Sequence, residues 1–153
     1  MPSLEVEGAV LTDSVAIVQF LADRHGALTH AAGTIERGLQ DGATQFAIDE
    51  VDGPLWSAAR HSFVLPKEQR LPEAKEAARR DFAAAMQALA SRLGERAYLA
   101  GAEFTVPDLI LGHCAGWAER AKFARPDGPA GAYFARRRAR PALRRALEAA
   151  AAL

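Results

Sequence analysis

The sequence predicts a mostly α-helical protein in which a short β-hairpin precedes an all-α bundle. Strand-like alternation is confined to residues 3–11, near the start of the chain. From residue 34 onward, apolar side chains recur at three- and four-residue spacing, which is the period of a helix face turned toward a core. Gly and Pro breaks divide this region into separate helices. The 153 residues suffice for one domain, or for a small fragment plus a full domain.

The hairpin is expected at residues 3–11. Leu4 and Val6 alternate with polar residues, and Glu7-Gly8 separates them from a second β-prone run at 9–11. An acidic residue followed by Gly between two short runs of this kind is typical of a two-residue hairpin turn.

A first helix is expected directly after the hairpin. Thr12, Asp13 and Ser14 can cap its N-terminus, and His25-Gly26 matches a last helical turn followed by a C-terminal Gly. Its apolar face consists of Val15, Ile17, Val18, Phe20 and Leu21.

Helices account for the rest of the chain. A long helix is expected over 34–63, with a kink at 52–54 where the sequence reads Asp-Gly-Pro. A second helix follows Pro72 and ends at Gly94, and a third spans 105–123. The last stretch is an Ala/Arg helix interrupted near Pro141.

The third helix carries the clearest local pattern. Thr105 and Asp108 form a capping box, while Phe104 and Leu109 occupy the two positions of a hydrophobic staple. Apolar residues surround this helix almost completely, so we expect it to be buried as the axis of the bundle. The only cysteine, Cys114, lies on this helix and is interpreted as a core residue.

Composition limits the classes of function. Lysine plus arginine and aspartate plus glutamate balance at 19 each, so bulk charge gives no reason to expect nucleic acid. We interpret the arginines at 136–138, with Arg140, Arg144 and Arg145, as a solvated helix face. No apolar run approaches the roughly 18 residues that span a bilayer, so no membrane partner is expected. A single cysteine and the lack of a secretory signal at the N-terminus favour the cytoplasm.

Three segments, taken together, resemble the cytosolic glutathione transferases. The first reads PSLEVEG at 2–8 and LTDSVAI at 11–17, and the second reads YLAG at 98–101 and FTVPD at 104–108. The third consists of Tyr133, Arg136 and the RPA run at 140–142. Their order and spacing match those of the family over essentially the whole chain.

The resemblance implies a division of the chain. Residues 1–26 would be the remnant of a thioredoxin-like domain, consisting of a β-hairpin plus a helix. Residues 34–153 would be the all-helical C-terminal bundle of the glutathione transferases. The strands and helices of the first half of the thioredoxin-like domain would lie upstream of Met1, and we expect the natural protein to extend roughly 50 residues further in that direction.

The resemblance also implies a glutathione site formed by Met1, Pro2, Asp13 and Ser14. In the family, the proline that matches Pro2 follows a cis bond, and the residue that matches Met1 pairs through its backbone with the cysteinyl part of glutathione. Asp13 and Ser14 match residues that hold the γ-glutamyl end, although Glu or Gln is more usual at the first of these two positions. Judged from the residues alone, the alternative is that Asp13 and Ser14 only cap a helix.

A second, apolar site for a small hydrophobic electrophile is implied on two of the helices. Its candidate residues are Trp56, Arg60, His61, Trp117, Lys122 and Phe123, and ordinary packing is the alternative. Gln45 falls near a position from which some family members reach across a homodimer, or it is an ordinary polar helix residue.

The function expected from the resemblance is binding of glutathione and its conjugation to, or the reduction of, a small electrophile. Nothing in this chain replaces the Tyr, Ser or Cys that stabilises the glutathione thiolate, so the chain by itself is expected to be inactive or weak. Without the strands expected upstream of Met1, one edge of the hairpin would have no pairing partner, and an unpaired strand edge predicts self-association. One alternative is a non-catalytic module for dimerisation or protein interaction, and another is an isomerase or dehalogenase on the same scaffold.

Overall fold

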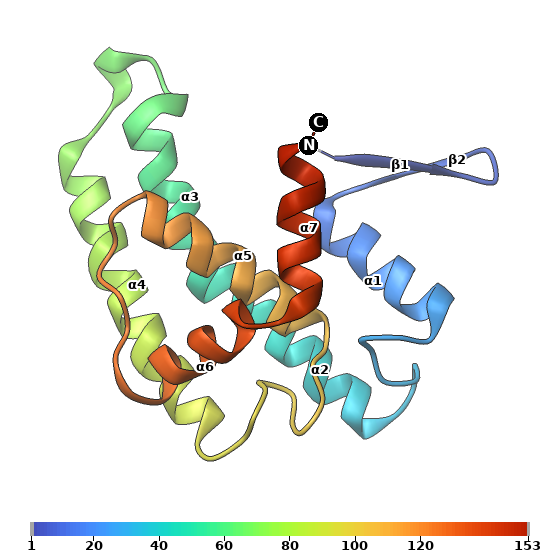
Figure 1. The fold of residues 1–153 in the computed structure, drawn as a ribbon. Helices are drawn as coiled ribbons and strands as arrows, with labels where there is room; N and C mark the ends of the chain where they lie inside the picture. Colours follow the sequence, from blue (N-terminus) through green and yellow to red (C-terminus); the bar gives the residue numbers. More distant parts are fainter. Residues whose placement is uncertain (1, 153) are drawn as a thin grey trace.

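A β-hairpin extends from one side of a helical bundle (Figure 1). The structure is a computed structural model that describes residues 2–152. Strands β1 (Ser3–Val6) and β2 (Ala9–Thr12) pair antiparallel, with Ser3 opposite Thr12. Both turn residues have positive φ, 52° at Glu7 and 80° at Gly8, as a type I′ hairpin turn requires. The predicted hairpin and its two-residue turn are therefore confirmed.

Helix α1 (Ser14–His25) follows the hairpin and ends as predicted. Gly26 is left-handed, with φ 58° and ψ 36°, and its N–H bonds to carbonyl groups of the last helical turn. Ala22 is the only buried residue of this helix. The predicted apolar face is therefore only partly covered within the described part of the chain.

The long helix expected over 34–63 is present as four joined segments. They are α2 (Ile35–Phe46), the π-helix η1 (Ala47–Asp52), α3 (Gly53–Ala59) and a second π-helix, η2 (Arg60–Val64). Helical backbone angles continue through Asp52 and Gly53. The π-helical turn therefore precedes Pro54, at the position where the sequence predicts a kink.

The remaining helices are separated by short connections. A 3-10 turn, η3 (Lys67–Gln69), leads into α4 (Pro72–Leu93), which ends at Gly94 as predicted. Helix α5 spans Val106–Arg120, α6 spans Gly128–Arg138, and α7 spans Pro141–Ala151. No helix among residues 2–152 is long and apolar enough to cross a membrane.

Helix α5 lies at the centre of the bundle. It packs against α1, α2, η1, α3 and α6, and Leu111 and Cys114 are fully buried on it. The expectation that this helix is the buried axis of the bundle is confirmed, although His113 and Arg120 are exposed and Leu109 is half-buried. One lengthwise stripe of α5 therefore lies outside the core.

A buried glutamine joins the hairpin half of the molecule to the bundle. The Gln40 side chain on α2 is fully buried, and its Oε1 accepts a hydrogen bond from the His30 N–H at 2.9 Å. Its Nε2 donates to Gln19 Oε1 on α1 at 3.0 Å and to Thr29 Oγ1 at 3.2 Å. Because the amide bonds both to α1, at Gln19, and to the connection that leads from α1 to α2, at Thr29 and His30, Gln40 fixes how α1 sits on α2.

The predicted capping box at the start of α5 is confirmed and is part of a larger network. Asp108 is fully buried, and its Oδ2 accepts from the Thr105 N–H at 2.9 Å. Its Oδ1 accepts from the Leu99 N–H at 3.0 Å and from the Tyr133 hydroxyl at 2.8 Å. One carboxylate thus holds the loop before α5, the first turn of α5 and helix α6 together.

Candidate functional site

The open end of the hairpin brings together three of the four residues expected to bind glutathione. Because Ser3 pairs with Thr12, Pro2 and Asp13 lie at the same end of the two strands, directly before Ser14 at the start of α1. Pro2, Asp13 and Ser14 are all exposed. Met1 lies outside the described residues, and so does the geometry of its bond to Pro2.

Asp13 has an unusual backbone conformation at this end. Its φ of 74° and ψ of 124° lie in a region that non-glycine residues rarely adopt, at a cost of about 1–3 kcal/mol. Its Oδ1 accepts hydrogen bonds from the N–H groups of Val15 at 2.9 Å and Ala16 at 3.2 Å. Asp13 is therefore the N-cap of α1, in agreement with the capping role that the sequence indicated. Its second carboxylate oxygen takes no part in the cap.

Ser14 is the first residue of α1, at the positive end of the helix dipole. The cap of Asp13 satisfies the N–H groups of Val15 and Ala16, which leaves the Ser14 hydroxyl and N–H outside it. A helix N-terminus with an available N–H and a hydroxyl is suited to a carboxylate ligand. The free Asp13 oxygen beside it is suited to an ammonium group.

The six residues expected at the apolar second site do not form one cavity. Trp56 and Arg60 are exposed, and His61 accepts from the Leu71 N–H through Nδ1 at 3.1 Å. Lys122 is exposed too, Trp117 is half-buried, and Phe123 is buried. The structure therefore supports the packing interpretation for Phe123, whose ring meets that of Phe82 edge-on with centroids 5.1 Å apart.

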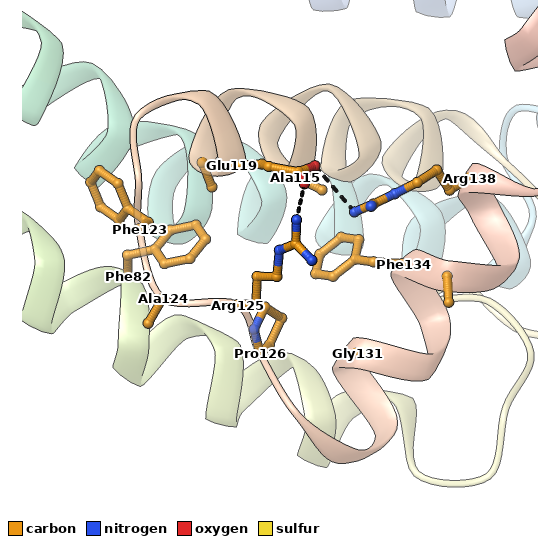
Figure 2. Close-up of a pocket in the computed structure, with 12 residues that line it drawn as sticks. Phe82, Ala115, Glu119, Phe123, Ala124, Arg125, Pro126, Gly131, Phe134 and Arg138 are labelled. Carbon is orange, nitrogen blue, oxygen red and sulfur yellow. Dashed lines mark hydrogen bonds and ion pairs between the residues drawn. The ribbon is translucent and has the colours of Figure 1, made fainter.

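A cavity of about 340 Å³ lies between α4, α5 and α6, and Phe123 forms part of its wall (Figure 2). Glu119 projects into it and forms ion pairs with Arg125 and with Arg138, the latter at 3.4 Å. No residue of the hairpin or of α1 lines this cavity. It is therefore separate from the end of the hairpin.

Two buried groups with exchangeable protons are held in their neutral forms. Burial and the neighbouring Asp52, whose Oδ1 is 3.7 Å from Sγ, raise the pKa of the Cys114 thiol well above its usual range. Burial and the bond to Asp108 likewise raise the pKa of the Tyr133 hydroxyl. Cys114 is a core residue, as predicted, and neither group is available to stabilise a thiolate.

The arginines at 136–138 are only in part the solvated face that the sequence suggested. Arg136 donates to the Ala97 carbonyl at 3.1 Å, and Arg138 pairs with Glu119. Arg137 is half-buried, and Arg140 lies over the Phe104 ring at 3.7 Å. Arg144 and Arg145 are exposed on α7, as expected.

Gln40 is the connecting residue that the sequence analysis missed. It lies on the same side of the long helix as Ala43, Ala47 and Val51, at three- and four-residue spacing, and all four residues are buried. A polar residue in register with an apolar stripe is the signal that could have identified it.

Comparison with known proteins decides the family. The model of the glutathione S-transferase C-terminal domain matches residues 72–149, about half of the chain. The chain belongs to the glutathione transferase family. A search of the curated proteins returns no significant match.

Solved structures of glutathione transferases match nearly the whole chain. A glutathione transferase from Methylococcus capsulatus superposes with a TM-score of 0.85 at 27% identity, covering 100% of this chain and 74% of that one. The beta-class enzyme from Sphingomonas chungbukensis is 30% identical, with a TM-score of 0.81 and coverage of 97% and 73%. A sphingomonad enzyme complexed with glutathione is also 30% identical, with a TM-score of 0.82 and the same coverage. The predicted family and fold class, a thioredoxin-like remnant followed by the helical bundle, are therefore confirmed.

Proposed function

We propose that this chain binds the γ-glutamyl end of glutathione at the open end of the hairpin. The Ser14 hydroxyl and N–H receive the α-carboxylate, and the free oxygen of Asp13 receives the ammonium group. Pro2 and Met1 border the cysteinyl part. The observation that carries this proposal is the strained backbone of Asp13, which holds a carboxylate at a helix N-terminus beside a free hydroxyl. The sphingomonad relative that was solved with glutathione supports the choice of ligand.

The reaction class that we propose is conjugation of glutathione to a small hydrophobic electrophile, or reduction of such a compound. Conjugation requires the glutathione thiolate as nucleophile, and an unassisted thiol is mostly protonated at neutral pH. Cys114 and Tyr133 are buried in the core, and the Tyr133 hydroxyl already donates to Asp108, so neither supplies that stabilisation. We therefore propose that this chain binds glutathione but has little or no transferase activity by itself.

The alternative function is a non-catalytic module for dimerisation or protein interaction. It is favoured by two large apolar side chains one turn apart on α2, since Ile35 is 80% exposed and Leu39 is 63% exposed. We propose a homodimer that covers these residues, and a cytoplasmic location in keeping with the single free cysteine. We also propose that the chain is divided into a partial thioredoxin-like domain, residues 1–26, and an all-helical C-terminal domain, residues 34–153.

Calorimetric titration with glutathione tests the proposed binding site. We expect Ser14→Ala and Asp13→Asn each to weaken binding about tenfold, because each removes a hydrogen bond or ion pair to a charged group. Asp13→Asn keeps an acceptor for the helix cap, so its midpoint of unfolding stays that of the unchanged chain. Ser91→Ala, at an exposed serine on α4, is the matched control and leaves the affinity unchanged.

Absence of glutathione binding by the unchanged chain would refute the proposed site and favour the non-catalytic module. Equal binding by the Ser14→Ala and Ser91→Ala variants would place the ligand elsewhere.

Light scattering tests the dimer separately. We expect Leu39→Glu to convert the dimer to a monomer, whereas Leu71→Glu, at an exposed leucine before α4, does not. A monomer for the unchanged chain would refute this part.

A further inference from the structure

The balance of charge over the whole chain conceals a strong local imbalance. Residues 1–68 carry four lysines and arginines against ten aspartates and glutamates. Residues 119–148, which form the end of α5, the connection after it, α6 and most of α7, carry nine lysines and arginines against three aspartates and glutamates. The neutral total therefore does not describe this segment, and the reason for not expecting nucleic acid does not hold for it.

The cations of this segment come together in space. Glu119 on α5 pairs with Arg125, from the connection, and with Arg138, from the end of α6 (Figure 2). Arg138 also lines one cavity of about 700 Å³ together with Arg120 and Arg140, and α7 begins directly after Arg140. We call the exposed cations of this region the basic surface: Arg120, Lys122, Arg125, Arg138, Arg144 and Arg145.

Most of the positive charge on the basic surface is uncompensated. Glu119 pairs with Arg125 through one carboxylate oxygen and with Arg138 through the other. Within residues 2–152, no ion pair or side-chain hydrogen bond is formed by Arg120, Lys122, Arg144 or Arg145. Neighbouring cations without counter-charges repel one another and attract an anionic polymer.

Local helix energetics do not explain two of these cations. Arg144 lies in the first turn of α7, where no acidic residue is present and the helix dipole disfavours a cation. Lys122 has a φ of 57°, a backbone conformation that favours glycine. The arginines at 136–138 differ, because they lie in the last turn of α6, where cations stabilise a helix. A bound anion would offset the cost at Arg144 and at Lys122.

The side chains between these cations favour phosphate groups over a protein partner. Protein interfaces are centred on large apolar or aromatic side chains. Leu147 is the one large apolar side chain exposed on α6 and α7. The other uncharged side chains exposed there are mainly alanines: Ala132, Ala135, Ala139, Ala142 and Ala146. Eight of the nine cations at 119–148 are arginines, whose planar guanidinium matches two oxygens of a phosphate.

The aromatic residues of the segment distinguish between double and single strands. Phe123, Tyr133 and Phe134 are its only aromatic side chains, and all three are buried. Proteins that bind single strands stack the bases on exposed aromatic rings. A duplex needs no such stacking, because its phosphates alone supply the attraction.

We propose that the basic surface binds double-stranded nucleic acid through its phosphates, without reading the base sequence. The four cations that lack a partner each contact one phosphate. The basic surface shares no residue with the proposed glutathione site at Asp13 and Ser14, so this binding does not depend on glutathione.

Fluorescence anisotropy with a labelled DNA duplex of about 20 base pairs tests the proposal, and an RNA duplex of equal length forms the second arm. Four phosphate contacts predict that the logarithm of the binding constant falls with the logarithm of the salt concentration with a slope of about −3.6. Binding should therefore weaken about 150-fold between about 50 mM and 200 mM salt. Such a slope with either duplex supports the proposal, and the tighter arm identifies the kind of duplex.

Paired variants test whether the basic surface is the binding site. Arg144→Gln combined with Arg145→Gln should weaken binding at least tenfold at low salt and reduce the slope to about −1.8. Because α7 has no buried residue, circular dichroism should report an unchanged bundle. Lys67→Gln combined with Arg80→Gln removes two exposed cations elsewhere, is the matched control, and should change the affinity less than threefold.

A second pair, Arg120→Gln combined with Lys122→Gln, removes the other two cations without a partner and should have the same effect on affinity and slope. Equal affinities of either pair and of the control pair would overturn the proposal, as would absence of binding to both duplexes at low salt. Displacement of the duplex by polyglutamate at equal charge would assign the surface to an acidic protein. Tighter binding to phosphatidylserine vesicles than to either duplex would assign it to an anionic membrane, and both of these results would also overturn the proposal.

Discussion

Replacing Asp108 by alanine should remove a large part of the stability of the bundle. The carboxylate is fully buried and accepts hydrogen bonds from the Leu99 and Thr105 N–H groups and from the Tyr133 hydroxyl. Asp108→Ala leaves these three buried donors without a partner, and each such loss costs about 1–3 kcal/mol. We expect a decrease of about 4 kcal/mol in the free energy of unfolding, against about 5–15 kcal/mol for a typical domain.

The measurement is urea unfolding followed by far-ultraviolet circular dichroism, with Asp127→Ala as the matched control. Asp127 is exposed at the N-cap of α6 and makes no side-chain cap bond, so its replacement should change the free energy of unfolding by less than about 0.5 kcal/mol. Tyr133→Phe should cost about 1.5 kcal/mol, and in the double variant with Asp108→Ala the two losses should fall short of additivity by about 1 kcal/mol.

A loss of less than about 1 kcal/mol for Asp108→Ala would refute the reasoning, because the buried donors would then have found other partners. Full additivity with Tyr133→Phe would show that the hydroxyl and the carboxylate do not interact.

Three other changes test the remaining features. Gln40→Leu should lower the free energy of unfolding by about 2 kcal/mol, because it leaves the partners of the buried amide unpaired. Gln45→Leu, at an exposed residue of the same helix, should change it by less than about 0.5 kcal/mol, and equal effects of the two variants would contradict the role of the buried amide. Gly26→Ala should cost about 1 kcal/mol in urea unfolding because φ is 58° there, and no loss would contradict that cap. Since the folded-state pKa of Cys114 is raised, the unfolded chain loses the thiol proton first, and stability should fall as pH rises above about 8.5, by up to about 1.4 kcal/mol per pH unit. This slope should diminish in Cys114→Ala, and an unchanged slope would assign the effect to other groups.

The parts of the fold that sequence predicts well are those set by local chemistry. The hairpin follows from Glu7-Gly8, and α4 ends at Gly94, because turns and helix ends depend on a few neighbouring residues. The sequence predicts that the third helix reaches Phe123, but α5 ends at Arg120. Two residues later, Lys122 adopts a positive φ of 57°, which a helix does not allow. Phe123 continues the apolar pattern because it packs on Phe82, a contact that no local pattern encodes.

The candidate site also has a part that the sequence predicts and a part that only the structure shows. The sequence pattern indicated Asp13 and Ser14, but only the structure shows the positive φ that places the Asp13 carboxylate at the helix N-terminus. The apolar residues that almost surround α5 predicted a buried axis of the bundle, which assumes that other elements cover nearly every face. At Leu109 and His113, one stripe of α5 stays open. The spacing of apolar residues predicts which helix face would be stabilised by burial, but it does not show whether another element covers that face.

The Gln40 side chain also makes its own part of the junction between α1 and α2 independent of acidity. The junction needs one acceptor facing the His30 N–H and one donor facing Gln19 and Thr29, and a primary amide supplies both without titrating. A carboxylate there would need a proton to donate, and an imidazole would change its charge near neutral pH. The amide contacts that hold α1 on α2 therefore persist over the whole range in which carboxylates and histidines titrate. Among the contacts that hold α1 on α2, the amide contacts are therefore the uncharged ones, and they accompany the ion pair between Asp23 on α1 and Arg37 on α2 at 2.8 Å.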